Sequence, residues 1–230
     1  MELQVRTLFE LDAFGRIVRR GRGAEPPLPR PAPRFFLGRT HAGNVILLHQ
    51  DLPQPVAGEL RTIAAAEPLA LDFEEPPRQI YPLLHALRRH SSASELWRGP
   101  AFTFPDELPA AADNVAMLTQ ADTHRLHPDL AEWAIDFPDC QPAFAAFDAG
   151  VAVAICACAR SGRGGAEAGV ETAPGFRGKG YAPAAALAWA RAIRESGRVP
   201  FYSTSWENVA SRAVARKLGL ILFGEDIHVS

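Results

Sequence analysis

The stretch Glu167-Ala-Gly-Val-Glu-Thr-Ala-Pro-Gly-Phe-Arg-Gly-Lys-Gly-Tyr-Ala182 is the most informative part of this 230-residue chain. It predicts a strand over 166–172, a glycine-bearing turn and an alanine-rich helix over 180–196. At such a junction, unpaired backbone N–H groups and the positive end of the helix dipole point at one spot, which favours a pyrophosphate. Two carboxylates, Glu167 and Glu171, precede the turn. The stretch therefore predicts an enzyme that uses a phosphate-bearing cofactor.

The glycines of the turn are suited to close approach of a ligand. Gly178 and Gly180 carry no Cβ atom that would block a phosphate, and Pro183 fits the first helical turn, where a missing N–H group costs nothing. An ordinary strand-to-helix turn is the alternative interpretation of two glycines alone.

Two common phosphate-binding motifs do not fit this turn. A Walker loop would need glycine at position 173 and serine or threonine at position 180, where the chain has Ala173 and Gly180. A dinucleotide fingerprint that began at Gly178 would need glycine or alanine where Pro183 stands. A different class of cofactor is therefore expected.

Two motifs together carry a resemblance to a known family. Arg177-Gly-Lys-Gly-Tyr-Ala182 matches the Arg/Gln-x-x-Gly-x-Gly/Ala signature of the GCN5-related N-acetyltransferase (GNAT) superfamily. Downstream, Tyr202-Ser-Thr-Ser-Trp-Glu-Asn-Val-Ala-Ser211 and Ala215-Arg-Lys-Leu-Gly-Leu220 resemble the next strand, asparagine and helix of that family. The chain is most similar to the GNAT subgroup with an additional N-terminal region.

The resemblance implies an α+β fold. Residues 111–230 would form a GNAT domain with a mixed, mostly antiparallel sheet, splayed where acetyl-CoA inserts, and with helices on both faces. Residues 1–110 would form an N-terminal α/β extension of β-hairpins and short helices, with a boundary near Pro109.

Periodicity places the remaining elements. Strands are predicted over 6–11, 16–20, 34–38, 45–49, 115–119, 144–147, 151–159, 200–206 and 221–229. Helices are predicted over 56–66, 80–90, 122–135 and 209–218. Residues 25–33 contain five prolines and predict an extended connector, and 68–109 is otherwise irregular.

The resemblance also implies a cofactor site. The backbone of Val170, Glu171 and Thr172 would bind the pantetheine arm. The turn would hold the pyrophosphate through Arg177, Gly178, Lys179, Gly180, Tyr181, Ala182 and Pro183. Asn208 would contact the cofactor arm, although it is equally suited to cap the following helix, with Ser211 three residues on.

Acetyl transfer to an amine requires a base, because a lysine-type amine has a pKa of about 10.4. Glu167 and Glu171 are four residues apart and share one face of a regular strand. In relatives a glutamate near position 167 is a common base, so Glu167 is preferred slightly over Glu171. The alternative is that both carboxylates face solvent or an arginine.

The proton donor is not identified. Many family members have a tyrosine seven residues after the asparagine, where this chain has Ala215. Tyr202, Ser203 and Ser205 are the substitutes that the sequence offers.

The composition limits the classes of binding partner and the compartment that are expected. The formal net charge of −2 gives no overall attraction to nucleic acid or membrane. Three cysteines, no N-terminal signal region and no apolar run of about 18 residues predict a reduced, cytoplasmic protein. Cys156 and Cys158 alternate on one strand and favour buried thiols, so no metal is expected. A homodimer is left open.

These patterns predict an N-acetyltransferase that moves an acetyl group from acetyl-CoA to an acceptor amine by direct attack. The alternative is a non-catalytic protein that binds CoA or acetyl-CoA through a degenerate GNAT domain, as a sensor or an interaction partner. The sequence does not identify the acceptor.

Overall fold

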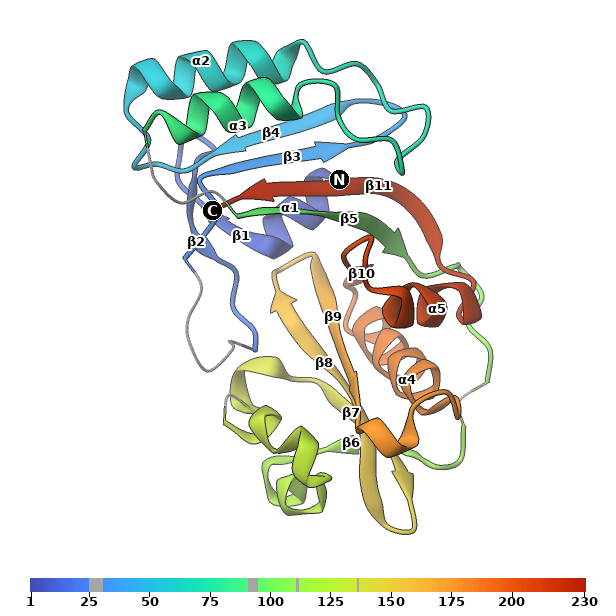
Figure 1. The fold of residues 1–230 in the computed structure, drawn as a ribbon. Helices are drawn as coiled ribbons and strands as arrows, with labels where there is room; N and C mark the ends of the chain where they lie inside the picture. Colours follow the sequence, from blue (N-terminus) through green and yellow to red (C-terminus); the bar gives the residue numbers. More distant parts are fainter. Residues whose placement is uncertain (25–30, 91–94, 111, 136) are drawn as a thin grey trace.

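The computed structural model describes residues 1–24, 31–90, 95–110, 112–135 and 137–230. Its centre is a nine-stranded sheet (Figure 1). In spatial order the strands are β4 (Asn44–Leu48), β3 (Phe35–Arg39), β11 (Ile221–Val229), β5 (Leu96–Thr103), β10 (Val199–Ser203), β9 (Gly165–Thr172), β8 (Val151–Ser161), β7 (Ala143–Asp148) and β6 (Val115–Leu118). Of these neighbouring pairs, β9 and β10 are parallel and the rest antiparallel, which confirms a mixed, mostly antiparallel sheet.

Helices cover both faces of this sheet. One face, the α4 face, carries α2 (Gln54–Ala65), α3 (Ile80–Arg88), α4 (Tyr181–Glu195) and α5 (Val209–Lys217). The opposite face, the α1 face, carries α1 (Glu2–Leu8), the hairpin of β1 (Phe9–Leu11) and β2 (Ile17–Arg20), and the 3₁₀ segments η1 (Gln120–Arg125), η2 (Pro128–Ala134) and η3 (Phe137–Cys140). Helices on both faces were predicted and are confirmed.

The helix that follows the glycine turn forms as predicted. Ala186, Trp189 and Ile193 of α4 are fully buried against β8 and β9, together with Cys156. A further 3₁₀ segment, η4 (Pro174–Phe176), lies inside the turn that leads to this helix. The predicted hairpin over 34–49 and the helices near 56–66, 80–90 and 209–218 also form, with shifts of a few residues at their ends.

The predicted helix over 122–135 is wrong. The segment forms η1 and η2 instead, separated at His127, whose backbone is extended with φ −57° and ψ 145°. Pro128 causes the break, because a residue that precedes proline is pushed out of the α region. Asp122 reinforces the early start of η1 through a capping box with Thr119.

Helix α1 and strand β5 were not predicted. Helix α1 occupies the first half of the expected strand over 6–11, and β1 forms the second half; α1 buries the polar side chains of Gln4 and Thr7 and so lacks a clear apolar stripe. Strand β5 lies in the region that was predicted to be irregular. The strand was missed because Gly99 and Pro100 have low strand propensity. Gly99 is required there: the carbonyl oxygen of Thr204 lies 1.8 Å from where a Cβ atom would stand.

The sheet continues across the predicted boundary near residue 110. Strands β3, β4 and β5 precede this boundary, and β5 pairs with β10 on one side and β11 on the other. The division into domains 1–110 and 111–230 therefore stays a prediction. The strands of both regions form one sheet, and this sheet positions the site. Part of the connector predicted over 25–33 lies outside the described residues.

Candidate functional site

Strands β9 and β10 separate in the middle of the sheet. Their register ends at the pair Glu167 and Phe201, although β9 continues to Thr172 and β10 to Ser203. On its other side β9 stays paired with β8 as far as Thr172. The backbone of 168–172 therefore has no strand beside it on the β10 side within the described part of the chain, which leaves its polar groups available to a ligand. This is the splay that the family resemblance implied.

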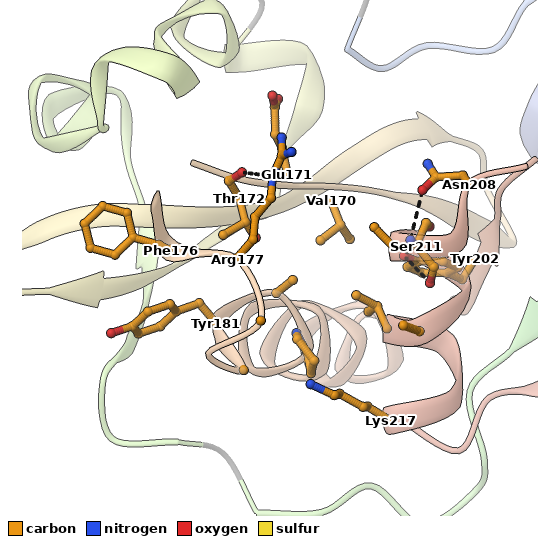
Figure 2. A pocket seen from close by; sticks show the side chains of 17 residues that line it. Val170, Glu171, Thr172, Phe176, Arg177, Tyr181, Tyr202, Asn208, Ser211 and Lys217 are labelled. Carbon is orange, nitrogen blue, oxygen red and sulfur yellow. Dashed lines mark hydrogen bonds between the residues drawn. The ribbon is translucent and has the colours of Figure 1, made fainter. Parts of the chain in front are cut away.

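A cavity of about 440 Å³ lies on the α4 face of this separation (Figure 2). Val170 and Thr172 of β9, Tyr202 of β10 and the starts of α4 and α5 line it. It gathers most of the residues predicted for cofactor binding, namely Val170, Glu171, Thr172, Arg177, Gly178, Gly180, Tyr181, Ala182, Pro183 and Asn208. Lys179 is not part of the lining; its ammonium group lies 4.9 Å from the centre of the Phe176 ring.

The glycine turn has the geometry that the sequence predicted. Gly178 and Gly180 adopt φ angles of 80° and 92°, which favour glycine. Apart from the adjoining backbone, no atom of the described residues lies within 4 Å of where either Cβ atom would stand. Gly180 is the N-cap of α4 and provides no side chain to the first N–H groups of the helix. The first turn of α4, which lines the cavity, therefore has no side-chain cap on its N–H groups.

Asn208 caps α5. Its side-chain oxygen accepts a hydrogen bond of 3.0 Å from the backbone N–H group of Ser211, and Asn208 also lines the cavity. Figure 2 shows Asn208, Ser211 and Tyr202 together at one end of the cavity, with Phe176, Arg177 and Tyr181 at the other. The capping role is confirmed, and a contact with the cofactor stays a prediction.

A second cavity, of about 330 Å³, lies on the α1 face of the same separation. Glu167 and Ser203 line it, and each is close in sequence to a residue of the first cavity, Val170 and Tyr202 respectively. The full lining is Leu8, Phe9, Arg20, Ala24, Phe36, Trp97, Ala159, Arg160, Glu167, Ser203, Asp226 and His228. The separation of β9 and β10 thus has a cavity on each face of the sheet.

Glu167 is buried in this second cavity with only 4% of its surface exposed. Burial raises its pKa to about 7, opposed in part by nearby Ser203, Gln4 and Arg160. Neither carboxylate oxygen makes a hydrogen bond of ordinary geometry with a described residue. Glu167 is therefore a carboxyl group that gains and loses its proton close to neutral pH.

Glu171 has different surroundings. Its carboxylate is exposed and accepts a hydrogen bond of 2.7 Å from the indole N–H group of Trp133. The Trp133 ring also lies 2.8 Å from where a Cβ atom at Gly169 would stand. The two glutamates share a face of β9 as predicted, but Glu167 is the one enclosed at the separation of the strands.

The position of the common family tyrosine holds no proton donor. Ala215 is 2% exposed and packs in the core with α4. Tyr202 lines the first cavity, and its hydroxyl lies 2.7 Å from the hydroxyl of Ser211. Burial raises the pKa of Tyr202 to about 12, so its phenol is protonated at neutral pH.

Several residues of the second cavity were missed by sequence reasoning. Trp97 lies on the unpredicted strand β5, and Asp226 and His228 lie on β11; Gln4 of the unpredicted helix α1 is outside the lining but donates to Asp226. One signal was available: Glu225 and Asp226 are adjacent on a strand inside an apolar segment. Because neighbouring strand residues face opposite sides, a covered strand must bury both carboxyls, and it does.

Within the described ranges, no group of three or more His, Cys, Asp or Glu side chains is arranged to hold a metal ion. Cys140, Cys156 and Cys158 are buried free thiols, as expected for the latter two. No helix in the same ranges combines the length and apolar character needed to cross a membrane.

Comparison with known proteins gives a family match over part of the chain. Residues 136–225 match the sequence model described as GNAT acetyltransferase. Among curated proteins, none matches the chain.

Solved structures share the fold at low identity. A GCN5-related N-acetyltransferase-like protein from Streptococcus suis 89/1591 is 16% identical, with 86% of this chain and 85% of that one covered and a TM-score of 0.50. A GNAT family acetyltransferase from Colwellia psychrerythraea is 11% identical, with 81% and 76% covered and a TM-score of 0.49.

A GNAT family protein from Novosphingobium aromaticivorans DSM 12444 is 17% identical, with 59% of this chain covered and a TM-score of 0.47. The match spans 64% of that protein, which is less than two thirds of its length. The family-model match over residues 136–225 confirms the resemblance to GNAT acetyltransferases that the glycine motif and the Asn208 segment predicted.

Proposed function

We propose that the protein is an N-acetyltransferase that moves an acetyl group from acetyl-CoA to an acceptor amine by direct attack. The observation that carries the proposal is the end of the β9–β10 register at Glu167 and Phe201, with one cavity on each face of the sheet. A donor bound on the α4 face and an acceptor bound on the α1 face would meet where the strands separate. The family, an acyltransferase family, supports acyl transfer in general.

The residues of the first cavity fit acetyl-CoA. The open space above Gly178 and Gly180 and the free N–H groups at the start of α4 suit a pyrophosphate. The unpaired backbone of β9 beyond Glu167 suits the amide groups of a pantetheine arm. When bound, acetyl-CoA would supply an acetyl thioester at the separation of the strands.

Glu167 is the base in this proposal. A lysine-type amine is protonated at neutral pH, and a carboxylate with a pKa of about 7 is far better matched to remove that proton than a solvated one. The amine nitrogen forms a bond to the acetyl carbon as the bond between that carbon and sulfur breaks. The electron pair of the broken bond stays on sulfur. The ammonium nitrogen loses two protons in all: Glu167 takes the one that leaves before the attack, and the one that leaves after the attack goes to solvent.

Tyr202 is the proposed proton donor to the sulfur. Its phenol is protonated at neutral pH, lines the donor cavity and lies on the strand next to Glu167. The hydrogen bond with Ser211 holds the hydroxyl in place. A thiol has a pKa of about 8.5, so such a donor assists the reaction without being indispensable.

The test is release of free thiol from acetyl-CoA in the presence of a panel of amines, combined with calorimetric measurement of acetyl-CoA binding. Release that depends on both an amine and acetyl-CoA is expected, and it should fall strongly in Glu167→Gln. Tight binding of acetyl-CoA without release on any amine would replace the enzyme by the second candidate, a non-catalytic CoA-binding protein. The buried Ala215 at the usual tyrosine position favours that candidate.

A further inference from the structure

We infer that the acceptor is a small molecule with two amino groups, of which one reacts beside Glu167 and the other binds to Asp226. The inference rests on the proposed function, because it names the class of amine that the α1-face cavity accepts. It starts from the unsatisfied hydrogen-bonding groups at this cavity.

Three buried side chains leave acceptor atoms without hydrogen-bond partners among the described residues. They are Oε1 and Oε2 of Glu167, Oδ1 of Asp226 and Oε1 of Gln4. The exposed fractions of Glu167, Asp226 and Gln4 are 4%, 2% and 0%, so bulk water does not solvate them freely. Unsatisfied buried acceptors of this kind call for a ligand that brings donors.

Gln4 lies between the two carboxyl groups. Its amide nitrogen donates a hydrogen bond of 2.8 Å to Oδ2 of Asp226, and Gln4 also lies close enough to Glu167 to lower the pKa of that group. Burial, together with the nearby charge of Glu167, raises the pKa of Asp226 well above its ordinary value, opposed in part by Gln4 and by the N-terminal ammonium group of Met1. The three side chains thus form one acidic cluster that begins at the separation of β9 and β10 and extends to β11.

The number of unsatisfied atoms indicates two amino groups. An ammonium group has three donors and no acceptor, which matches an acceptor-rich cluster. One ammonium group has three donors for four unsatisfied atoms, and the three atoms that belong to lining residues lie on two strands, β9 and β11. Two amino groups joined by a short chain supply enough donors and place one nitrogen at Glu167 and the other at Asp226.

The cavity wall suits the chain that joins two amino groups. The rings of Trp97 and His228 are stacked with centroids 4.8 Å apart, and Phe9 and Phe36 meet edge to face at 5.3 Å. All four rings line the cavity. Aromatic surface packs well against methylene groups and also attracts a cation. The volume of about 330 Å³ fits a short diamine.

Two arginines on the same lining point to the competing ligand, an amine that carries a carboxylate. Arg20 donates to the carbonyl oxygen of Pro31, and Arg160 donates to those of Ala24 and Ala159. Both side chains are partly exposed, in contrast with the buried acidic cluster. The proposal favours the diamine because the unsatisfied atoms are acceptors, and the experiment includes the carboxylate.

The experiment compares three amines of one chain length: 1,4-diaminobutane, butylamine and 4-aminobutanoate. Thiol release from acetyl-CoA is measured with each. The expected kcat/KM for the diamine exceeds that for the other two by roughly tenfold or more, since a hydrogen bond to a charged group contributes about 1.5–3 kcal/mol. Equal values for the diamine and butylamine, or a higher value for 4-aminobutanoate, would overturn the inference.

A pair of variants tests whether Asp226 causes the preference for the diamine. Asp226→Asn should bring the ratio of kcat/KM between diamine and butylamine close to one, while Asp51→Asn, an exposed aspartate on another surface, should leave it unchanged. Gln4→Met should lower the ratio as well and replaces Asp226→Asn if that variant does not fold. An unchanged ratio in a folded Asp226→Asn variant contradicts the placement of the second amino group.

Calorimetry separates this inference from the proposed function. If no amine supports thiol release, 1,4-diaminobutane should still bind about tenfold more tightly than butylamine and lose that advantage in Asp226→Asn. That outcome would support the cavity assignment and refute the reaction. No preference for the diamine in binding would refute the cavity assignment itself.

Discussion

Glu167 and Phe201 are the last residues that pair across β9 and β10, and the carboxyl group of Glu167 is buried next to the opening that follows. The end of the pairing frees the backbone of β9 toward the α4 face, while the side chain of Glu167 enters a cavity on the α1 face. One position therefore limits the strand pairing and supplies the candidate base.

Glu167→Gln should lower kcat by about 10²–10⁴, the usual contribution of a general base, and leave acetyl-CoA affinity nearly unchanged. In the wild type, kcat should rise with pH through about 7 as Glu167 loses its proton. The variant should lack this rise. Glu171→Gln is the matched control on the same strand; an equal loss of kcat there would contradict the assignment.

The same residue should make stability depend on pH. Between pH 4.5 and about 7 the folded protein keeps the proton of Glu167 whereas the unfolded chain has lost it. The folded state therefore binds more protons, and its stability falls as the pH rises through this window. Relative to the wild type, Glu167→Gln should gain about 3 kcal/mol of unfolding free energy between pH 4.5 and pH 8. Denaturant unfolding at several pH values measures this gain, and a constant difference would contradict the burial of an unpaired carboxyl.

Gly180→Asp should weaken acetyl-CoA binding by at least tenfold, because it places a negative charge where the pyrophosphate is proposed to bind. The φ angle of 92° also adds backbone strain of about 1–2 kcal/mol. Gly150→Asp is the control: Gly150 has a φ of 84° and equally open surroundings in the β7–β8 turn, and it lines neither cavity. Calorimetry should show lost affinity in the first variant alone. Comparable losses in both would mean that strain, and not the ligand, explains the effect.

Tyr202→Phe should lower kcat by about tenfold or more and leave the dissociation constant of acetyl-CoA nearly unchanged, since it removes the proposed donor to the thiolate. Ser211→Ala removes the hydrogen-bond partner of that hydroxyl and keeps the phenol. It should therefore have the smaller effect. Steady-state rates with calorimetric binding decide the matter, and unaltered kcat in Tyr202→Phe would exclude it as the proton donor.

The first cavity could be predicted from sequence and the second could not. The turn at Gly178 and Gly180, the helix that follows and the cap at Asn208 depend on residues close together in the chain, and local patterns record such geometry. The second cavity combines Trp97, Glu167 and Asp226, which meet only because β5 and β11 pair in the centre of the sheet, and Gln4 is bonded to Asp226 beside it. Because Gly99 and Pro100 prevented the prediction of β5, this arrangement could not be predicted from the sequence.

The two glutamates show the same limit in one strand. Their spacing correctly predicted that both side chains share one face of the strand. It could not predict that Glu167 is buried while Glu171 accepts a hydrogen bond from Trp133. That difference depends on Trp133 in η2, a segment that was expected to be part of a continuous helix, and on α1, which was not expected at all.

A crystal structure of the protein with acetyl-CoA tests the central claim most directly. The account predicts the pyrophosphate at the N–H groups around Gly178 to Pro183 and the pantetheine arm along residues 170–172. The thioester should enter between β9 and β10, within reach of an amine hydrogen-bonded to Glu167, directly or through one water. A thioester that stays outside this separation, on the α4 face or away from Glu167, would contradict the claim.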